Sequence, residues 1–438
     1  MIYLDNAATS YPKPGCVLEA MTSALASCGA NPGRSGHRLS LAAGRIVEDC
    51  REALAQMLGE TDASRVVFAA NTTDALNMAI HGSLRTGDHA VTTLIEHNSV
   101  LRPLSELSRS GAITLTIAPP DAQGRIRAQD VERAMTPRTR LVAMTHMSNV
   151  LGVVQDVAAV GALCRRRGAL FLVDAAQTAG HLPLTPAAWG CSMLALPGHK
   201  GLLGPHGTGA LWVAADVRLA PMRQGGTGSV SESMFQPRMM PDALESGTLN
   251  LPGIAGLRAG MRVALANREE AHENAVGLCA QMREALLGIP GVRVYTPKGA
   301  SLLSFNIEGI ASQEAASALD EAGIAVRGGL HCAPGVHRFL GTLETGAVRV
   351  SPGISNTRED ARQLVAAVAR LARSADQKGP PLGGRRSLAK GFPLPEGERK
   401  HSEKAFNHSL KEESINRNLL MASGGQMAPL KPATSWST

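Results

Sequence analysis

Five short apolar runs, each followed by polar or small residues, constrain what this 438-residue chain can fold into. They read RVVFAA, HAVTTL, RLVAMT, LFLVDA and MLAL, in this order between Arg65 and Leu196, and stretches with helical periodicity alternate with them. This alternation is typical of a mostly parallel sheet. The Gly-rich segment GPHGTGALWVA that follows predicts a hairpin-like return. The sequence therefore predicts an α/β fold, in which ligands bind at the carboxyl ends of the strands.

Two ionisable side chains follow neighbouring runs within the stretch from Leu170 to Gly201. A buried Asp174 needs a partner, because an isolated carboxylate is costly in an apolar interior, and a protonated ring nitrogen of a cofactor would suit it. Lys200 lies in a turn of small residues, where a lysine can lose its proton and form a Schiff base. An aspartate and a lysine around one ring are the protein's contribution to pyridoxal phosphate (PLP) chemistry. Read separately, they could be a helix N-cap and a solvated loop lysine; together they favour PLP.

Composition excludes several other classes of protein. The seven cysteines are odd in number and form no CxxC pair, which argues against a zinc site and a disulfide framework and favours a reducing cytoplasm. The start of the chain lacks the features of a signal peptide, and no apolar run is long enough to span a bilayer. Of the net charge of +7, the last 64 residues carry +4, so the remaining chain is nearly neutral. With aromatic residues at 3%, we expect no nucleic-acid partner and no membrane contact.

The motifs DAAQ and GHK, YLDNAAT at the N-terminus and VRVSPGISNT near Thr357 resemble the class V, fold-type I PLP enzymes. Among these the chain looks most like the cysteine desulfurase and selenocysteine lyase group, in its group II-like branch with a short active-site loop. The resemblance implies a large PLP-binding domain with a mostly parallel sheet and a smaller C-terminal α+β domain. The expected parts are an N-terminal arm (1–14), the large domain (15–253), the small domain with the cysteine loop (254–374) and a mostly disordered tail (375–438). A docking role for that tail is a weaker alternative.

Residues that follow the predicted strands supply the expected cofactor site. The NTTD segment begins a helix, whose N-terminal N–H groups bind anions; Thr72 and Thr73 could be ordinary helix caps, but they resemble the family's phosphate loop. His97 in EHN resembles the histidine that stacks on the cofactor ring and exchanges protons. The resemblance further implies that Asn149 and Gln177 contact the phenolic oxygen of the cofactor, and that Asp174, His199 and Lys200 also contact the cofactor. It implies a homodimer, in which Thr248 of ESGTLN reaches the phosphate of the partner's cofactor.

The C-terminal part carries the residues expected to handle substrate. Cys332 lies in RGGLHCAPGVH, with Arg327, His331 and His337 nearby in sequence, and such cationic neighbours lower a thiol pKa and make a nucleophile. A lone cysteine is usually a small buried residue, but this loop resembles the segment that bears the persulfide cysteine. Arg349 in VRVS resembles the arginine that binds the substrate α-carboxylate with both arms. Asn149 and Arg327 complete the predicted substrate contacts.

Some positions depart from the family pattern. Gly33 replaces a common histidine, so only Arg34 and His37 match that motif, which approaches the partner's site in relatives. Pro197 replaces a hydroxyl residue that reaches the phosphate, and it also lacks a backbone N–H, so we expect lower cofactor affinity. Leu249 replaces a common proline. None of these changes touches the predicted lysine, aspartate or cysteine.

The sequence predicts a cytoplasmic PLP-dependent cysteine desulfurase that converts L-cysteine to L-alanine. Lys200 would hold PLP and move the Cα proton, Asp174 would keep the ring nitrogen protonated, and Cys332 would take the sulfur as a persulfide. The sulfur would then pass to an acceptor protein or a reductant that the sequence does not identify. Two alternatives remain: a selenocysteine lyase acting on L-selenocysteine, and a catalytically weak PLP-fold scaffold or sulfur carrier.

Overall fold

The main sheet of the computed structural model, which describes residues 1–32 and 36–378, has seven strands. In spatial order they are β2 (Val66–Ala69), β8 (Gly209–Val213), β7 (Met193–Pro197), β6 (Leu170–Asp174), β5 (Thr139–Thr145), β3 (His89–Thr93) and β4 (Thr114–Ala118). β8 runs antiparallel to the other six strands, as the expected hairpin-like return requires. The mostly parallel α/β sheet is confirmed, and β4 is an edge strand that the sequence analysis did not predict.

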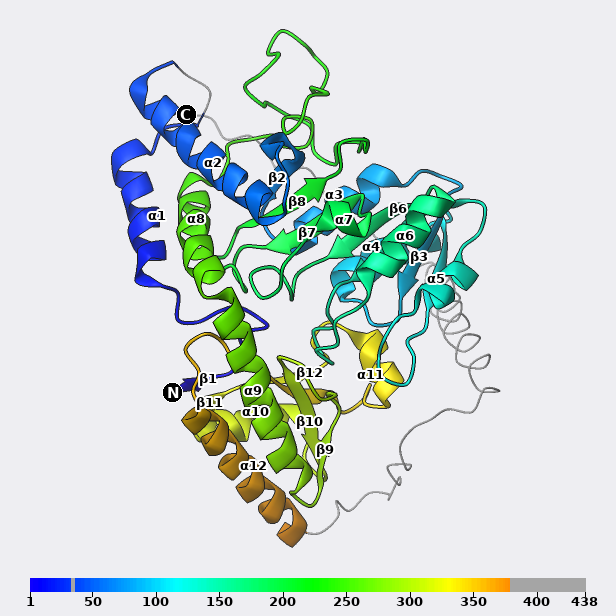
Figure 1. Ribbon diagram of the computed structural model, residues 1–438, viewed down its shortest axis with the longest axis vertical. Coiled ribbons are helices and arrows are strands. Elements are labelled where there is room, and N and C mark those ends of the chain that lie inside the picture. Colours follow the sequence, from blue (N-terminus) through cyan, green and yellow to red (C-terminus); the bar gives the residue numbers. More distant parts are fainter. Residues whose placement is uncertain (33–35, 379–438) are drawn as a thin grey trace, which may run out of the picture. The chain divides into compact units, whose positions relative to one another are not determined.

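Helices cover both faces of this sheet (Figure 1). Alternate residues of each strand join two separate apolar clusters: Phe171 and Val173 of β6 lie in one, and Leu172 lies in the other. This is the period of two that a strand buried on both faces requires. The helices around the sheet are α1 (Gly15–Cys28), α2 (Arg38–Met57), α3 (Thr72–Ser83), α4 (Asn98–Arg109), α5 (Ala128–Ala134), α6 (Val157–Arg167), α7 (Pro186–Trp189) and α8 (Leu251–Ala266), with a 3₁₀ turn at Ala63–Arg65.

A smaller antiparallel sheet follows in the C-terminal part of the chain, as expected. Its strands, in spatial order, are β12 (Arg327–Gly329), β13 (Ala347–Val350), β10 (Leu303–Ile307) and β9 (Val292–Val294). The helices of this part are α9 (Arg268–Leu287), α10 (Ser312–Glu321), α11 (Pro334–Leu340) and α12 (Arg358–Lys378). Met282, Phe305 and Leu364 lie in its core, which is a third apolar cluster distinct from those of the main sheet.

The N-terminal segment belongs structurally to this C-terminal part. Strand β1 (Ile2–Tyr3) pairs in parallel with β11 (Ile324–Ala325), and Asp5 forms a β-bridge with Ser351. The backbone N–H of Ser351 donates to the Leu4 carbonyl at 2.7 Å. The first residues of the chain are therefore ordered by partners more than 300 positions away in the sequence.

The sequence predicts one long helix from Ile254 to about Leu287 and a last helix near Glu359–Arg373, and both expectations need correction. The stretch from Ile254 to Leu287 was expected to form one helix, but it forms α8 and α9 with a break at Asn267, whose φ of −114° and ψ of 10° are not helical. The Asn267 side chain donates to the Val263 carbonyl at 2.8 Å, an alternative to continued helical hydrogen bonding. The last helix continues to Lys378, beyond the expected end near Arg373.

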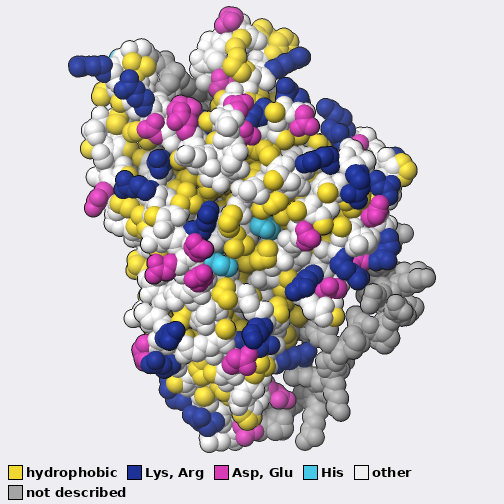
Figure 2. Space-filling view, viewed as in Figure 1, with side chains coloured by type: hydrophobic (Ala, Val, Ile, Leu, Met, Phe, Trp, Pro, Cys, Tyr) yellow, Lys and Arg dark blue, Asp and Glu magenta, His cyan; other side chains and the backbone are white. Residues whose placement is uncertain are grey.

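The rest of the predicted tail, from residue 379, lies outside the described residues, as does Arg34. Among the described residues, no helix has the length and apolar composition that crossing a membrane requires. On the face seen in Figure 2, basic and acidic side chains are mixed, with apolar side chains between them.

Candidate active site

Several predicted residues meet at the carboxyl ends of the parallel strands. Asp174 is the last residue of β6 and lies opposite Thr145 of β5, while Lys200 follows β7. His97 comes four residues after the end of β3 and caps α4. The charges of these groups act on one another: Lys200 lowers the pKa of both Asp174 and His97. The structure therefore brings these three side chains into one electrostatic cluster, at the edge of the sheet where α/β proteins bind ligands.

Asp174 is buried, with 3% of its surface exposed. Its Oδ1 accepts a hydrogen bond from the N–H of Ala176 at 2.9 Å. Burial raises the pKa of this carboxyl, while the Ala176 N–H and the charge of Lys200 lower it. In the described part of the chain no cationic side chain forms an ion pair with Asp174, so its buried carboxyl would be stabilised by a cationic partner from outside the chain.

Lys200 lies in the turn PGHKG, which the N-terminal segment holds in place. The carbonyl oxygen of His199 accepts hydrogen bonds from the Ser10 N–H at 3.1 Å, the Thr9 hydroxyl at 3.0 Å and the Lys13 ammonium at 2.7 Å. No ion pair or hydrogen bond engages the Lys200 amine within residues 1–32 and 36–378. Burial lowers the pKa of Lys200 to about 8, an effect that nearby arginines reinforce and Asp174 opposes. An amine with this pKa is a competent nucleophile near neutral pH.

His97 is held by the start of its own helix. Its Nδ1 accepts a hydrogen bond from the Ser99 N–H at 3.1 Å, which places the ring proton of the neutral form on Nε2. Burial, together with the positive charges of Lys200 and nearby arginines, lowers the pKa of His97 to about 4. The ring is therefore neutral at pH 7. The Ser99 hydroxyl also contacts Thr73 Oγ1 at 2.7 Å, which links His97 to the predicted phosphate loop.

The predicted phosphate loop begins α3. Asn71 caps this helix by accepting the Asp74 N–H at 3.0 Å, and Thr72 and Thr73 lie in the first turn, where backbone N–H groups have no intrahelical partner. Thr248 is exposed in the segment before α8, and no described hydrogen bond joins its side chain to these threonines. Pro197 ends β7 opposite Gly209. The single chain therefore supplies only part of the predicted phosphate site.

The two amides predicted to contact the cofactor are buried and already donate within the chain. Asn149 Nδ2 donates to the His331 carbonyl at 2.7 Å, and Gln177 Nε2 donates to the Ala7 carbonyl at 3.1 Å. His199, also a predicted contact, stacks on His206, and its Nδ1 is buried without a hydrogen-bond partner among the described atoms. His37, by contrast, caps α2 by accepting the Ser40 N–H at 3.2 Å. This contact gives His37 a structural role within its own subunit.

Cys332 is an exposed cysteine on a loop that hydrogen bonds join to the start of α4 and to the segment after β5. Its carbonyl accepts the Asn98 N–H at 2.7 Å, and the preceding carbonyl accepts Asn149 Nδ2. Both His331 and Cys332 adopt positive φ angles, 51° and 55°, a conformation that non-glycine residues rarely adopt. The loop is therefore fixed by hydrogen bonds from the residue after His97 and from Asn149 in the segment that follows β5.

The histidines beside Cys332 are not the cationic neighbours that the sequence analysis expected. Burial lowers the pKa of His331 to about 3 and that of His337 to about 4, so both rings are neutral near pH 7. Their rings stack, and His337 Nδ1 lies 2.9 Å from the Thr342 hydroxyl. Only Arg327, the third expected neighbour, carries a positive charge.

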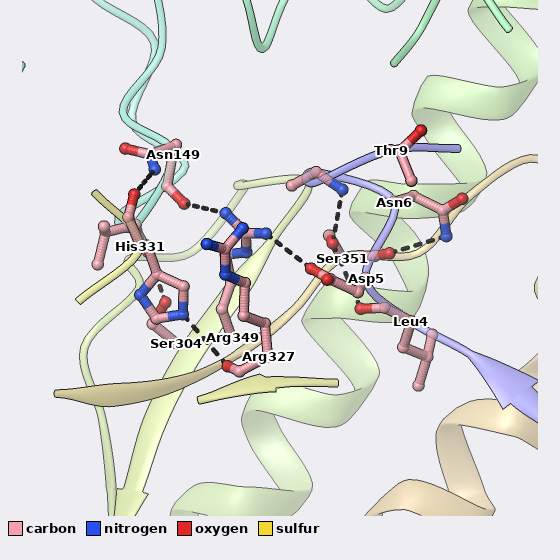
Figure 3. A network of polar contacts seen from close by, with 12 residues as sticks. Leu4, Asp5, Asn6, Thr9, Asn149, Ser304, Arg327, His331, Arg349 and Ser351 are labelled. Carbon is pink, nitrogen blue, oxygen red and sulfur yellow. Dashed lines mark hydrogen bonds and ion pairs between the residues drawn. The ribbon is translucent and has the colours of Figure 1, made fainter. Parts of the chain in front are cut away.

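Arg349 occupies the middle of the polar network in Figure 3. Its side chain is 1% exposed, and its Nη2 forms an ion pair with Asp5 Oδ1 at 2.7 Å. Its Nη1 donates to the Asn149 carbonyl at 3.2 Å. Arg327 lies directly opposite it on the neighbouring strand. The predicted substrate residues Arg327, Arg349 and Asn149 therefore lie together, beside the Cys332 loop.

Sequence reasoning missed two acidic residues in this region. Asp5 belongs to the YLDNAAT motif and was given no role of its own, yet it forms an ion pair with Arg349. Glu96 is fully buried next to His97, and burial raises its pKa to about 8, so it is largely protonated at pH 7. A signal was available: each is an acidic residue in a short segment with apolar neighbours, which predicts a buried partner.

The donor set fits PLP. The buried Asp174 has no cation of its own, Lys200 has an amine with a lowered pKa and no partner in the described chain, and α3 presents free N–H groups to an anion. Asp174 would face the ring nitrogen, Lys200 would bind the aldehyde carbon, and the start of α3 would hold the phosphate. The neutral His97 ring is suited to stacking.

This fold is that of a PLP-dependent class of enzymes. The chain belongs to the aminotransferase class-V family, whose model matches residues 2–364. Within that family, its similar proteins are cysteine desulfurases. A probable cysteine desulfurase of Methanothermobacter thermautotrophicus is 37% identical over 375 residues, which are 83% of this chain and 92% of that relative.

Solved structures agree with this placement. The apo structure of a cysteine desulfurase from Thermococcus onnurineus NA1 matches with a TM-score of 0.80 and 33% identity, over 85% of this chain and 95% of that one. A cysteine desulfurase from Escherichia coli matches with a TM-score of 0.78 and 31% identity, over 85% and 94% of the two chains. The family and the fold type predicted from the sequence are confirmed, while the group II assignment stays a prediction.

Proposed function

We propose that this chain is a PLP-dependent cysteine desulfurase that converts L-cysteine to L-alanine and takes the sulfur on Cys332. The observation that carries the proposal is the anchoring of the exposed Cys332 to Asn98, the neighbour of His97. This hydrogen bond fixes the backbone of Cys332 beside the residue that follows His97, which belongs to the same electrostatic cluster as Lys200 and Asp174. Other reactions of class V enzymes, such as transamination, have no need of a cysteine in that place.

The bound PLP ring would supply an electron sink for the carbon atoms of the substrate. Asp174 favours a protonated ring nitrogen, since its carboxylate is buried and lacks a cation. Arg349, helped by Arg327, holds the substrate carboxylate through charge-assisted hydrogen bonds. The Lys200 amine, with its lowered pKa, takes the Cα proton of the substrate. The neutral His97 accepts or donates a proton through Nε2.

Cys332 is the residue that accepts the sulfur of the substrate. Its thiolate attacks the sulfur of the substrate, so that a sulfur–sulfur bond forms while the carbon–sulfur bond breaks. The electron pair of the broken bond stays on the substrate carbon, which takes up a proton and leaves in L-alanine. Cys332 is left as a persulfide, which an acceptor protein or a thiol reductant must then reduce to restore the thiol.

The test is alanine release from L-cysteine by the purified, PLP-loaded protein in the presence of a thiol reductant. Lys200→Ala should abolish turnover, and Cys332→Ala should lower it at least a hundredfold, because each removes a reacting group. Cys28→Ala, which changes a partly buried cysteine of α1, is the matched control and should keep full activity. Steady alanine release by either of the first two variants would contradict the proposal.

A selenocysteine lyase is the second candidate, and one observation favours it. The neutral state of His331 and His337 leaves Arg327 as the one charged neighbour expected to activate the thiol. A selenium leaving group departs more readily than sulfur, so it depends less on such activation. In the same assay, activity of wild type and Cys332→Ala on L-selenocysteine, with neither active on L-cysteine, would select this function.

The predicted homodimer is part of the proposal. Thr248 is exposed, and the preceding loop exposes Met234, Phe235 and Met239 at 96%, 84% and 70% of their surfaces. Clustered exposed apolar side chains of this size are typical of an interaction surface. This supports a role for Thr248 at the phosphate of the partner's cofactor.

Mixing two inactive variants tests this shared site. If Thr248 acts across the interface, a heterodimer of Lys200→Ala and Thr248→Ala subunits contains one site with both residues intact, and activity returns. If Thr248 acts within its own subunit, every site in the heterodimer lacks one of the two residues. Activity no higher than that of the separate variants would therefore exclude the shared site.

A further inference from the structure

Two arginines face each other across the small sheet. Arg327 of β12 and Arg349 of β13 are directly opposite in the strand register, so their side chains share one face (Figure 3). Like charges in this arrangement repel and destabilise a sheet unless an anion lies between them or beside them. In the described part of the chain, Asp5 is the acidic residue that forms an ion pair with this arginine pair. One carboxylate therefore faces two positive charges.

Asp5 engages only one of the two nitrogen atoms on the side of the Arg349 guanidinium that faces it. The Nε and Nη2 atoms of a guanidinium lie on one edge, and together they can donate to both oxygens of a carboxylate. Asp5 accepts from Nη2 at 2.7 Å, whereas Nε is buried without a hydrogen-bond partner among the described atoms. A buried donor without a partner costs free energy. The pairing with Asp5 is therefore incomplete, and a carboxylate that engaged both nitrogen atoms would improve on it.

The same contact closes Arg349 to an incoming ligand. Arg349 is 1% exposed, while Asp5 is 19% exposed, so the carboxylate of Asp5 covers the guanidinium from the open side. We infer that Asp5 is a resident carboxylate which the α-carboxylate of the amino-acid substrate replaces on Arg349. This inference rests on the proposed role of Arg349. It makes Asp5 a positioning residue that sets substrate affinity through Arg349.

Asp5 belongs to the N-terminal segment that also holds the turn of Lys200 through the His199 carbonyl. The backbone around Asp5 is held separately, because the Asn6 N–H donates to the Ser351 carbonyl at 3.2 Å. Release of the Asp5 side chain from Arg349 therefore leaves this segment, and with it the turn of Lys200, in place.

Binding of L-alanine, the proposed product, to the PLP-loaded full chain tests the exchange by calorimetry. Asp5→Asn removes the competing charge at nearly constant shape, and we expect about tenfold tighter binding, the effect of one charge-assisted hydrogen bond. Asp5→Glu keeps a carboxylate and should bind L-alanine like wild type. Asp5→Ser is a second neutral variant in case the first does not fold. The matched control is Asp49→Asn, which removes an exposed carboxylate of α2.

L-Alanine methyl ester separates competition from a general effect on the site, because it lacks the carboxylate. Its affinity should be the same in wild type and Asp5→Asn. Unchanged or weaker L-alanine binding by the folded neutral variants would overturn the inference, as would equally tighter binding of the ester. Arg349→Gln identifies a different failure: if it binds L-alanine as well as wild type, the proposed role of Arg349 is wrong, and the exchange falls with it.

Discussion

Lys200 shows how the surroundings of one residue set its chemistry. Burial and the positive charges of Arg349 and Arg327 lower its pKa to about 8, and Asp174 and Asp5 oppose them. The arginines that hold an anionic substrate therefore also favour the neutral, nucleophilic form of the lysine. The same two charges help to keep His97 neutral. Substrate recognition and proton transfer are coupled through charge.

This coupling predicts the pH dependence of PLP uptake by the apo-protein. The rate should rise through about pH 8, because the neutral amine is the reacting form and the Lys200 pKa is lowered to about that value. Arg349→Gln removes a charge that lowers this pKa, so the rise should move to higher pH. Stopped-flow absorbance of PLP binding measures both profiles. A rise at the same pH in the variant would show that Arg349 does not act on the lysine.

Sequence reasoning assigned Lys200, Asp174 and Arg349 to the predicted site because each follows or lies in an apolar run within a motif, and in the structure the charges of Asp174 and Arg349 both act on Lys200. It could not assign the charge of His331 and His337, which depends on burial by segments distant in the sequence. Nor could it find the pairing of Asp5 with Arg349, since the two are 344 positions apart. Spacing along a chain indicates residue type and local element, but a hydrogen-bond partner depends on the folded topology.

At the scale of elements, the segment before α8 is tied to the main sheet by a buried ion pair. Arg51 of α2 donates to Glu245 through Nη1 at 2.6 Å and Nη2 at 3.0 Å. Glu245 also accepts the Phe68 N–H of β2, and Arg51 also donates to the Val66 carbonyl. The Arg51–Glu245 pair therefore joins α2, β2 and the segment before α8. Glu245 lies three residues before Thr248. The pair fixes the place at which the loop leaves the sheet.

Glu245→Ala should lower the free energy of unfolding by about 3–5 kcal/mol, because it removes the buried partner of Arg51 and leaves this buried arginine with the exposed Glu48. Denaturant unfolding monitored by circular dichroism measures this loss. Glu132→Ala, which removes the exposed ion pair with Arg167 between α5 and α6, is the control and should cost about 1 kcal/mol or less. Equal losses in the two variants would contradict the structural role of the buried pair.

The helix that follows Cys332 packs tightly against the end of β3. A Cβ atom on Gly335 would collide with the Leu94 carbonyl oxygen, so a side chain there must push α11 away. Gly335→Ala should therefore lower sulfur transfer through displacement of Cys332, beyond its effect on stability. Gly277→Ala, in an open position of α9, should stabilise the protein by about 0.5–1 kcal/mol and keep activity. Alanine release and thermal unfolding of both variants distinguish these outcomes.

The strands of the main sheet were predictable where both faces are buried, because such strands are continuous apolar runs. β4 was missed because TLTIA is only partly buried at the edge and alternates polar and apolar residues. The break between α8 and α9 was missed as well. Asn267 is compatible with either a helix or a break, so the local sequence does not decide between them.

At the scale of the whole molecule, six histidines are held neutral by burial. The pKa values of His97, His146, His181, His199, His331 and His337 are lowered to about 3 or 4. An unfolded chain binds protons at these residues near pH 6.5. Between pH 6.5 and 4 the unfolded state therefore holds more protons, and the free energy of unfolding falls as the pH falls. Glu96, Asp174 and Glu245, whose pKa values burial raises, act in the opposite direction but are three groups against six.

We expect the unfolding temperature to decrease steadily from pH 6.5 to 4. His337→Gln cannot take up the proton, so it should make this decrease shallower, whereas the exposed His81 serves as control through His81→Gln. Differential scanning calorimetry across this pH range gives the two slopes. A wild-type unfolding temperature that is constant over the range would contradict neutral burial of the six histidines.

The pairing of β1 with β11, and of Asp5 with Ser351 and Arg349, has a consequence for biosynthesis. During synthesis, residues 2–5 find these partners only after positions 324–351 have been made. They therefore stay without them while the main sheet, which ends with β8, can already assemble. The predicted carboxylate site around Arg349 is completed later than the sheet that carries Lys200 and Asp174.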